Sequence, residues 1–337
     1  MKLIHTINHT DAFILAEQHV IVTTPGHLTG CAYTNLATAW DIPVAPGEFY
    51  QLSFDRIIVQ KDGLLSYYDS ATGELLHRVQ LTKKLFAFAG PSHVFQEDGI
   101  AGDTINLQLL DISTGAITGE ISIPADYQWY VSHPEVVIVS DEKHVLMAIE
   151  IASCKVLWEQ RVAILVENEV LGTTIPPSVH GHHLFCYTKS RKALKVDVYS
   201  GRLEWSFYNE LVQSTVPAVY NDTTYFAGNS HILAINASGE IFQEIKYDSY
   251  VKEPFYNRTY LAITDTAILL GNPETREILH FNSETGNIVR FYVIGTAGWS
   301  LLGYLFAVKE DQLFTVLKNN DGDRQLEIYS LKPDDVS

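Results

Sequence analysis

The chain has 337 residues, of which 46% are apolar and 19% are charged; this composition is typical of a packed globular protein and too apolar for a disordered one. The 40 acidic and 23 basic residues give a formal net charge of −17, which argues against binding to nucleic acid, because a phosphate backbone needs a basic face. No apolar run reaches the roughly 18 residues that a membrane-spanning helix requires, so we expect no contact with a membrane.

Near the start of the chain, residues 28–31 match the lipobox that precedes a lipidated cysteine. That processing needs an uninterrupted apolar segment upstream, whereas this one contains Asp11 and Glu17. Residues 11–24 also have the pattern of two strands. We therefore interpret the lipobox match as accidental.

Three cysteines, Cys31, Cys154 and Cys186, are widely spaced along the chain. Their number is odd and far too small for a disulfide scaffold. This usage fits a reducing compartment, so we expect a cytoplasmic protein.

A short motif recurs along the chain, and its clearest copy is Val196–Trp205. In it a strand ends in Asp or Asn, a glycine follows within a few residues, and apolar alternation then resumes. Copies are centred near residues 36, 73, 115, 154, 201, 239 and 286. The six intervals between 36 and 286 average roughly 42 residues, which is the spacing of a propeller blade.

Each copy is expected to form a hairpin, because the Asp or Asn side chain accepts from turn N–H groups and glycine permits left-handed backbone. Two more short strands precede each hairpin, which gives four strands per unit, as in residues 217–245. An eighth unit, 325–331, lacks its last strand, and Lys2–Ile7 has the pattern to supply it. We therefore predict an all-β fold over residues 1–337, a single β-propeller of eight four-stranded blades, with seven blades as the alternative.

The segment from Pro177 to Trp205, with its Asp-x-x-x-Gly-x-x-x-Trp ending, resembles the repeat of quinoprotein-like (PQQ-like) β-propellers. That family includes quinone-dependent dehydrogenases and non-catalytic scaffolds such as an outer-membrane assembly lipoprotein. The family pattern places tryptophan at the end of most units, whereas here only Trp40, Trp158 and Trp205 occupy that place. No residues match the calcium and quinone site, so the resemblance implies the non-catalytic branch, without a cofactor.

Two clusters contain side chains that could bind a metal ion. His180, His182 and His183 lie where the repeat places a turn. Histidines at i and i+2 of a strand could supply two zinc ligands, but a third and a fourth ligand cannot be named, so a solvated turn is favoured over a zinc site. Residues 319–323 lack the spacing of an EF-hand and read as a hairpin turn. No nucleophile elbow, zinc-protease motif or phosphate loop occurs in the chain. We therefore assign no catalytic and no metal-binding residues.

Loops that join successive blades open on one face of a propeller, and three consecutive ones, near 163–172, 206–216 and 246–256, are long. They and the loop near 126 combine aromatic side chains, which are common interface anchors, with carboxylates that steer basic partners. For any one aromatic residue, packing between blades is an equal alternative. The predicted partner-binding residues are Asp126, Tyr127, Trp129, Glu167, Glu169, Tyr208, Glu210, Asp248, Tyr250, Glu253 and Tyr256.

The leading hypothesis is a non-catalytic protein that binds a basic protein partner on this face, with an immunity or inhibitor protein that caps a basic toxin as its specific form. The alternative is an enzyme that uses the central channel, either a hydrolase or lyase acting on sugars or a degenerate quinone enzyme. A third possibility is a repeat scaffold within a larger complex. The sequence leaves the oligomeric state open.

Overall fold

The computed structural model describes residues 1–45, 48–172, 177–210, 217–228, 230–250, 260–272, 275–295, 298–309 and 311–332, and of residues 128, 260 and 303–305 only the backbone. These residues form eight four-stranded antiparallel sheets. Seven sheets contain four strands that follow one another in sequence, and in the eighth β1 (Lys2–Asn8) joins β32 (Arg324–Ser330). The fold is an all-β eight-bladed β-propeller, so the predicted class and the count of eight are confirmed.

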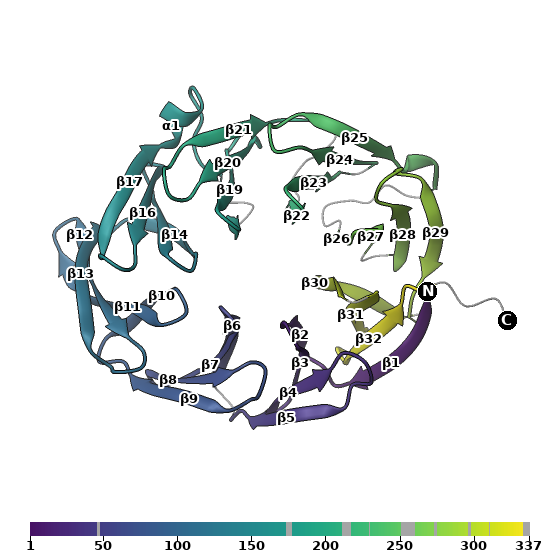
Figure 1. Ribbon diagram of the computed structural model, residues 1–337, viewed down its shortest axis with the longest axis horizontal. Helices are drawn as coiled ribbons and strands as arrows, with labels where there is room; N and C mark the ends of the chain where they lie inside the picture. The colour runs from purple at the N-terminus through teal and green to yellow at the C-terminus, as the bar shows by residue number, and fades with distance from the viewer. Residues whose placement is uncertain are drawn as a thin grey trace. The chain divides into compact units, whose positions relative to one another are not determined.

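The described strands divide between two compact units of four sheets each, Val44–Tyr208 (unit 2) and Met1–Pro43 with Asn209–Ser337 (unit 1). Figure 1 shows the sheets of unit 2 side by side in chain order, from dark blue to teal. The strands of unit 2 are β6 (Phe49–Ser53), β7 (Arg56–Lys61), β8 (Leu64–Asp69), β9 (Leu75–Gln80), β10 (Lys84–Ala89), β11 (His93–Ala101), β12 (Thr104–Asp111), β13 (Ile117–Pro124), β14 (Tyr127–Ser132), β15 (Val136–Asp141), β16 (Val145–Glu150), β17 (Lys155–Arg161), β18 (Ser178–His180), β19 (His183–Tyr187), β20 (Ala193–Asp197) and β21 (Leu203–Phe207). A single helical turn, α1 (Val162–Leu165), follows β17.

Unit 1 holds the other four sheets and a short 3-10 helix, Asp248–Tyr250. Besides β1 and β32, its strands are β2 (Ala12–Leu15), β3 (His19–Thr24), β4 (His27–Ala32), β5 (Thr38–Pro43), β22 (Ala218–Tyr220), β23 (Thr223–Ala227), β24 (His231–Ile235), β25 (Ile241–Lys246), β26 (Tyr260–Ile263), β27 (Ala267–Gly271), β28 (Glu277–Asn282), β29 (Ile288–Val293), β30 (Trp299–Lys309) and β31 (Gln312–Asn319). The register of β1 on β32 runs from Lys2 opposite Ser330 to Asn8 opposite Gln325. The predicted role of the N-terminal segment as the fourth strand of the last sheet is therefore confirmed.

The recurrent motif forms the turn between the third and fourth strands of a sheet. In the copy that follows β20, the Asp197 carboxylate accepts hydrogen bonds from the N–H groups of Tyr199 (3.2 Å) and Ser200 (2.8 Å). Gly201 then adopts a φ of 68°, a left-handed conformation that glycine takes without a steric penalty. Cys154 and Leu36, the centres of two copies that lack this glycine, have φ values of 54° and 53°. The turn geometry thus persists where the glycine is missing.

Apolar side chains pack in layers between neighbouring sheets. On β12, Leu107 and Leu109 pack with Val137 and Val139 of β15, whereas the alternate β15 residues Val136 and Ile138 pack against β19 and β20. Every residue of β15 is accordingly buried. Because both faces of such a strand are buried, the side chains that can meet a partner lie at the ends of the sheets. The candidate site is found there.

Antiparallel order gives each sheet two distinct ends. The turns between first and second strands and between third and fourth strands lie at one end, which we call the turn end. The turn between second and third strands and the connections to neighbouring sheets lie at the other, which we call the connection end. The predicted partner-binding residues of each unit belong mainly to its connection end.

Candidate protein-binding surface

Asp126, Tyr127 and Trp129 lie together where β13 leads into β14, at the connection end of unit 2. The Tyr127 ring packs edge-on against the ring of Phe86, with centroids 4.8 Å apart. The Trp129 side chain is half-buried and packs on the core that also contacts Leu165. Of the three residues, Asp126 therefore contributes charge, while the two aromatic side chains largely support the segment from beneath.

Glu167 and Glu169 follow α1 at the same end of unit 2, but their surroundings differ. Glu167 is exposed, whereas the Glu169 carboxylate accepts from the Ser190 hydroxyl at 2.6 Å and forms an ion pair with Lys192 at 2.9 Å. Burial alone would raise the pKa of Glu169, but the hydrogen bonds from Ser190 and Lys192 outweigh it and lower the pKa. Glu169 thus fixes the loop after α1, and Glu167 remains available to a partner.

The other predicted residues fall at the boundary of unit 2 or in unit 1. Tyr208 is exposed after β21, and Glu210 is also exposed. Asp248 and Tyr250 are exposed on the short 3-10 helix of unit 1, whereas the neighbouring Tyr247 is buried and donates its hydroxyl to the Gly228 carbonyl. The remaining two, Glu253 and Tyr256, lie outside the described residues.

Apolar exposure at the connection end of unit 2 exceeds what the sequence predicted. The exposed fractions are 62% for Phe49, 71% for Ile100, 74% for Ile164 and 52% for Tyr208. Phe49 begins β6, Ile100 lies at the tip of the β11–β12 hairpin and Ile164 is in α1. The prediction from sequence covered only aromatic and acidic residues of four loops, so it missed Phe49, Ile100 and Ile164. The signal that was available was an isoleucine flanked by Gly99 and Gly102, near the end of the β11–β12 hairpin.

Carboxylates accompany this apolar surface. Asp103, Glu142 and Glu167 are exposed, and Asp126 is half-buried. None of these four forms an ion pair with a described residue, and neither does Lys143. By contrast, Lys83 and Lys84 are paired with Asp98 (3.2 Å) and Glu97 (2.8 Å). The charge left uncompensated among these residues is negative.

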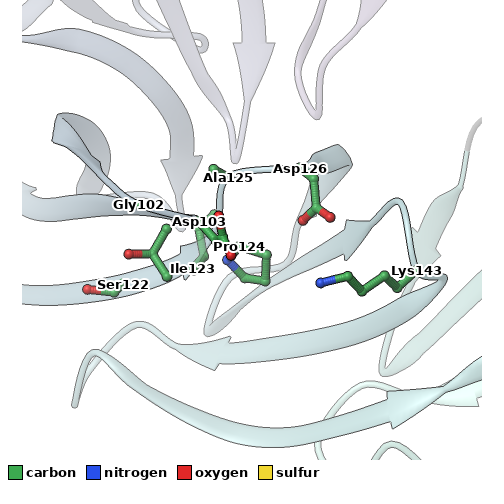
Figure 2. Close-up of a pocket in the computed structure, with 9 residues that line it drawn as sticks. Gly102, Asp103, Ser122, Ile123, Pro124, Ala125, Asp126 and Lys143 are labelled. Carbon is green, nitrogen blue, oxygen red and sulfur yellow. The ribbon is translucent and has the colours of Figure 1, made fainter.

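A hollow of about 690 Å³ opens between the β10–β13 and β14–β17 sheets at this end. Figure 2 shows the Asp126 carboxylate and the extended Lys143 side chain directed into it. Two backbone hydrogen bonds fix its walls, from the Ala125 N–H to the Asp103 carbonyl (2.8 Å) and from the Glu142 N–H to the Asp126 carbonyl (3.0 Å). A second hollow beside it is lined by Tyr127, Asp141 and Glu159, among others.

The histidine cluster occupies the β18–β19 turn, as predicted. The His182 ring lies 5.9 Å from that of His133 and 5.2 Å from that of Tyr199, at the turn end of unit 2. Burial lowers the pKa of His180, and burial followed by the nearby His182 lowers the pKa of His133. Across the described ranges, no three His, Cys, Asp or Glu side chains converge to hold a metal ion.

The predicted hairpin over residues 319–323 is also found, because the Asn319 side chain accepts from the Asp323 N–H at 2.8 Å. Cys31, Cys154 and Cys186 are buried and form no disulfide bond. Among the described residues, no helix has the length and apolar character to cross a membrane.

Comparison with known proteins identifies the repeat. A family model described as outer membrane protein assembly factor BamB matches residues 130–250. The BamB structure from Moraxella catarrhalis aligns with 97% of this chain and 99% of its own, with 16% identity and a TM-score of 0.59. Residues 130–250 are therefore similar to the PQQ-like, BamB-type β-propeller repeat.

Other structures with the same fold differ widely in what they do. The computationally designed protein Ika8 aligns with 96% of this chain and 96% of its own, at 13% identity and a TM-score of 0.64. Dihydro-heme d1 dehydrogenase NirN aligns with 96% of this chain and 75% of its own, at 14% identity and a TM-score of 0.55. Such low identities show the fold alone. No protein of curated function matches the sequence significantly.

The BamB-type match covers the part of the chain where the repeat motif is most regular. It includes the copies around Cys154, Gly201 and Gly239 and the residues from Tyr130 to Tyr250. Its boundaries therefore take in Ile164, Glu167 and Tyr208 of the candidate surface.

Proposed function

We propose that this PQQ-like propeller is a protein-binding scaffold, and that the connection end of unit 2 receives a basic protein partner. The observation that carries the proposal is the exposure of Phe49, Ile100, Ile164 and Tyr208 at that end, next to carboxylates that no described basic residue neutralises. Exposed apolar side chains supply the buried area of an interface. Unpaired carboxylates select and steer a partner of opposite charge.

Two further observations support the proposal: the net charge bears on the basic character of the partner, and the family match bears on binding to proteins. The net charge of −17 sets up a long-range attraction for a cation-rich protein. The family model that matches residues 130–250 is described as an outer membrane protein assembly factor, which is a role that acts on other proteins. A toxin inhibitor is the specific form of this proposal: the partner is then a basic nuclease, whose nucleic-acid site is complementary to an acidic surface.

We further propose that the protein acts in the cytoplasm. The support is the state of its thiols, since Cys31, Cys154 and Cys186 are all free and buried, as is usual where thiols stay reduced. Fractionation of native cells, with immunodetection of the full chain, tests this proposal. Recovery in the membrane or extracellular fraction would contradict it.

The decisive experiment compares two double variants with matched chemistry. Ile100→Ser with Ile164→Ser removes apolar area at the connection end of unit 2, whereas Phe242→Ser with Val293→Ser removes exposed apolar area from outer strands of unit 1. Each tagged full chain is used to isolate its partner from native cells at low salt. The protein recovered with wild type is then identified, purified and titrated calorimetrically against all three chains.

We expect the first double variant to raise the Kd about ten-fold or more, because apolar anchors dominate interface energies. The second should stay within about two-fold of wild type, and raising the salt concentration should weaken wild-type binding. Equal Kd values for the two double variants, or recovery of no partner by wild type, would refute the proposed surface. If the recovered protein degrades plasmid DNA, and stoichiometric wild-type chain does not stop it, the inhibitor form is refuted.

A further inference from the structure

The hollow beside Asp126 has the composition of a side-chain pocket. Its wall is formed by the turn Gly102–Asp103, the end of β13 and the turn that carries Lys143. Pro124 and Ala125, which are both half-buried, contribute apolar surface, and the carboxylates of Asp103 and Asp126 contribute negative charge. Its volume of about 690 Å³ falls within the roughly 300–1,000 Å³ typical of sites for small ligands.

The charged groups of the hollow are not satisfied within the chain. The side chains of Asp103, Asp126 and Lys143 make no hydrogen bond or ion pair with any residue in the described ranges. Two carboxylates against one ammonium group leave a net negative charge. By contrast, the Ser122 hydroxyl already donates to the Asn106 side chain at 2.7 Å, so its proton is not available to a ligand.

The hollow is also held open before any ligand arrives. Both carboxylate-bearing turns are fixed through their backbone, because the Asp103 carbonyl accepts from Ala125 and the Asp126 carbonyl accepts from Glu142. The Thr104 hydroxyl further donates to the Ala101 carbonyl at 3.0 Å. A side chain at Gly102 would meet no atom within 4 Å, so this edge of the hollow is open to an approaching chain. Fixed walls reduce the ordering cost of binding.

We propose that this hollow is a subsite for an arginine side chain of a protein partner, displayed on an extended segment. A guanidinium group presents five donors in a planar fork that matches carboxylates such as Asp103 and Asp126. Its aliphatic stem has an apolar surface in Pro124 and Ala125 to lie against. Lys143, across the hollow, meets a carboxylate or carbonyl of the same segment. This inference deepens the proposed function, because it names the side chain that the connection end of unit 2 selects.

The test uses two fluorescently labelled peptides, Gly-Arg-Gly-Arg-Gly and its counterpart with citrulline in place of arginine. Citrulline keeps the shape of arginine but lacks its charge. Fluorescence anisotropy with the full chain at low salt should show that the citrulline peptide binds about ten-fold more weakly or worse. Asp103→Asn with Asp126→Asn should weaken arginine-peptide binding by a similar factor. Lys143→Met should leave the arginine preference intact.

The matched control is Glu74→Gln with Glu284→Gln, which removes two exposed carboxylates at the turn ends of units 2 and 1. It should bind the arginine peptide within about two-fold of wild type, which separates the subsite from the effect of net charge. Equal binding of both peptides, or equal loss in both double variants, would overturn the inference. If the arginine peptide fails while Ile100→Ser with Ile164→Ser still abolishes partner binding, the subsite is wrong and the proposed function stands.

Discussion

Trp158 on β17 donates its indole N–H to the carbonyl oxygen of Val198 at 2.9 Å, and its ring lies against Gly201 in the turn of the next sheet. A Cβ atom placed on Gly201 would fall 2.6 Å from Cδ2 of that ring. The glycine and the tryptophan of the recurrent motif therefore meet as partners across neighbouring sheets. Glycine at this position provides the left-handed turn and also the space for the tryptophan of the preceding sheet.

The first prediction concerns this contact. Gly201→Ala should lower the free energy of unfolding by about 2–4 kcal/mol, through a strained φ together with overpacking against Trp158. Gly181→Ala is the control, because Gly181 has a φ of 54° in the same sheet but no atom within 4 Å of the added Cβ. It should cost only about 1–2 kcal/mol. Urea denaturation measures both values. Equal losses in the free energy of unfolding would show that overlap with Trp158 adds nothing to the cost of the strained φ.

One sheet earlier, the corresponding contact has its small residue on the outer strand and its larger residue in the turn. The turn position taken by glycine in other copies is Cys154, and the facing position on β13 is Gly119. A Cβ on Gly119 would lie 2.6 Å from the Cys154 Cβ and 3.1 Å from its Sγ. The pair at this contact thus keeps one small and one larger member, as Gly201 and Trp158 do.

The second prediction is that these two positions are energetically coupled. Gly119→Ala alone should destabilise the protein by about 1–3 kcal/mol, because the new methyl group overlaps Cys154. Adding Cys154→Gly removes the overlap, so the double variant should be more stable than the sum of the single changes by about 1 kcal/mol or more. The cycle is measured by urea denaturation. Gly119→Ala with Cys186→Ala, which changes a thiol on β19, should be additive, and additivity in the Cys154 cycle would disprove the coupling.

The sequence predicted the architecture well because the residues of the recurrent motif themselves determine the geometry of the turn. Asp111 and Asp197 each accept N–H groups of the turn that follows, and the turn glycine sets the reversal, so spacing alone located the hairpins. The family pattern also places tryptophan at the end of most units, and most of these tryptophans are missing here. At the corresponding place on β25, however, the Gln243 amide donates to the Ser283 and Glu284 carbonyls at 3.4 and 3.3 Å. A polar residue can thus replace tryptophan, which a motif written with tryptophan does not detect.

The candidate site was harder to predict, because a loop aromatic looks the same in sequence whether it faces solvent or packs on a neighbour. Tyr127 is packed against Phe86 and Tyr247 is buried, whereas Tyr208 and Tyr250 are exposed. The outcome depends on side chains contributed by other strands, which local pattern does not contain. Asp126 was recognised from its charge, but the hollow it lines also needs the turns at Gly102 and Lys143.

The third prediction concerns mildly acidic conditions. His133 is buried, its Nδ1 accepts from the Glu135 N–H at 3.2 Å, and the His182 and Tyr199 rings stand beside it. Burial and then His182 lower its pKa below 6.5, and Glu135 opposes this only in part. The unfolded chain therefore takes up the proton first, so stability that is present above about pH 6.5 is lost as pH falls.

His133→Asn keeps an acceptor for the Glu135 N–H but cannot be protonated. Between pH 7 and pH 5, its free energy of unfolding should fall less than that of wild type, by about 1 kcal/mol. Burial lowers the pKa of His180 and His280 as well, so some slope remains in the variant. Urea denaturation at pH 7, 6 and 5 measures the difference, with the exposed His9→Asn as control. A slope unchanged by His133→Asn would contradict the assignment.

The fourth prediction concerns stronger acid and the turn after β12. The Ser113 hydroxyl donates to the Asp111 carboxylate at 2.7 Å, and the Thr114 N–H and hydroxyl donate at 2.8 and 2.9 Å. These bonds lower the pKa of Asp111 to about 2. Since this value is below the ordinary 3.8, the turn contributes stability above pH 3.8, which is lost as pH falls toward 2.

Asp111→Asn retains an acceptor oxygen but loses the charge, so it should reduce the free energy of unfolding by about 1 kcal/mol at pH 7. The gap between variant and wild type should narrow as pH is lowered from 4 toward 2, because wild-type Asp111 is then being protonated. Urea denaturation at pH 7, 4 and 3 follows the gap, and Asp321→Asn in the exposed β31–β32 turn serves as control. A gap that stays constant over this range would show that the charge-assisted bonds to Ser113 and Thr114 do not stabilise the turn.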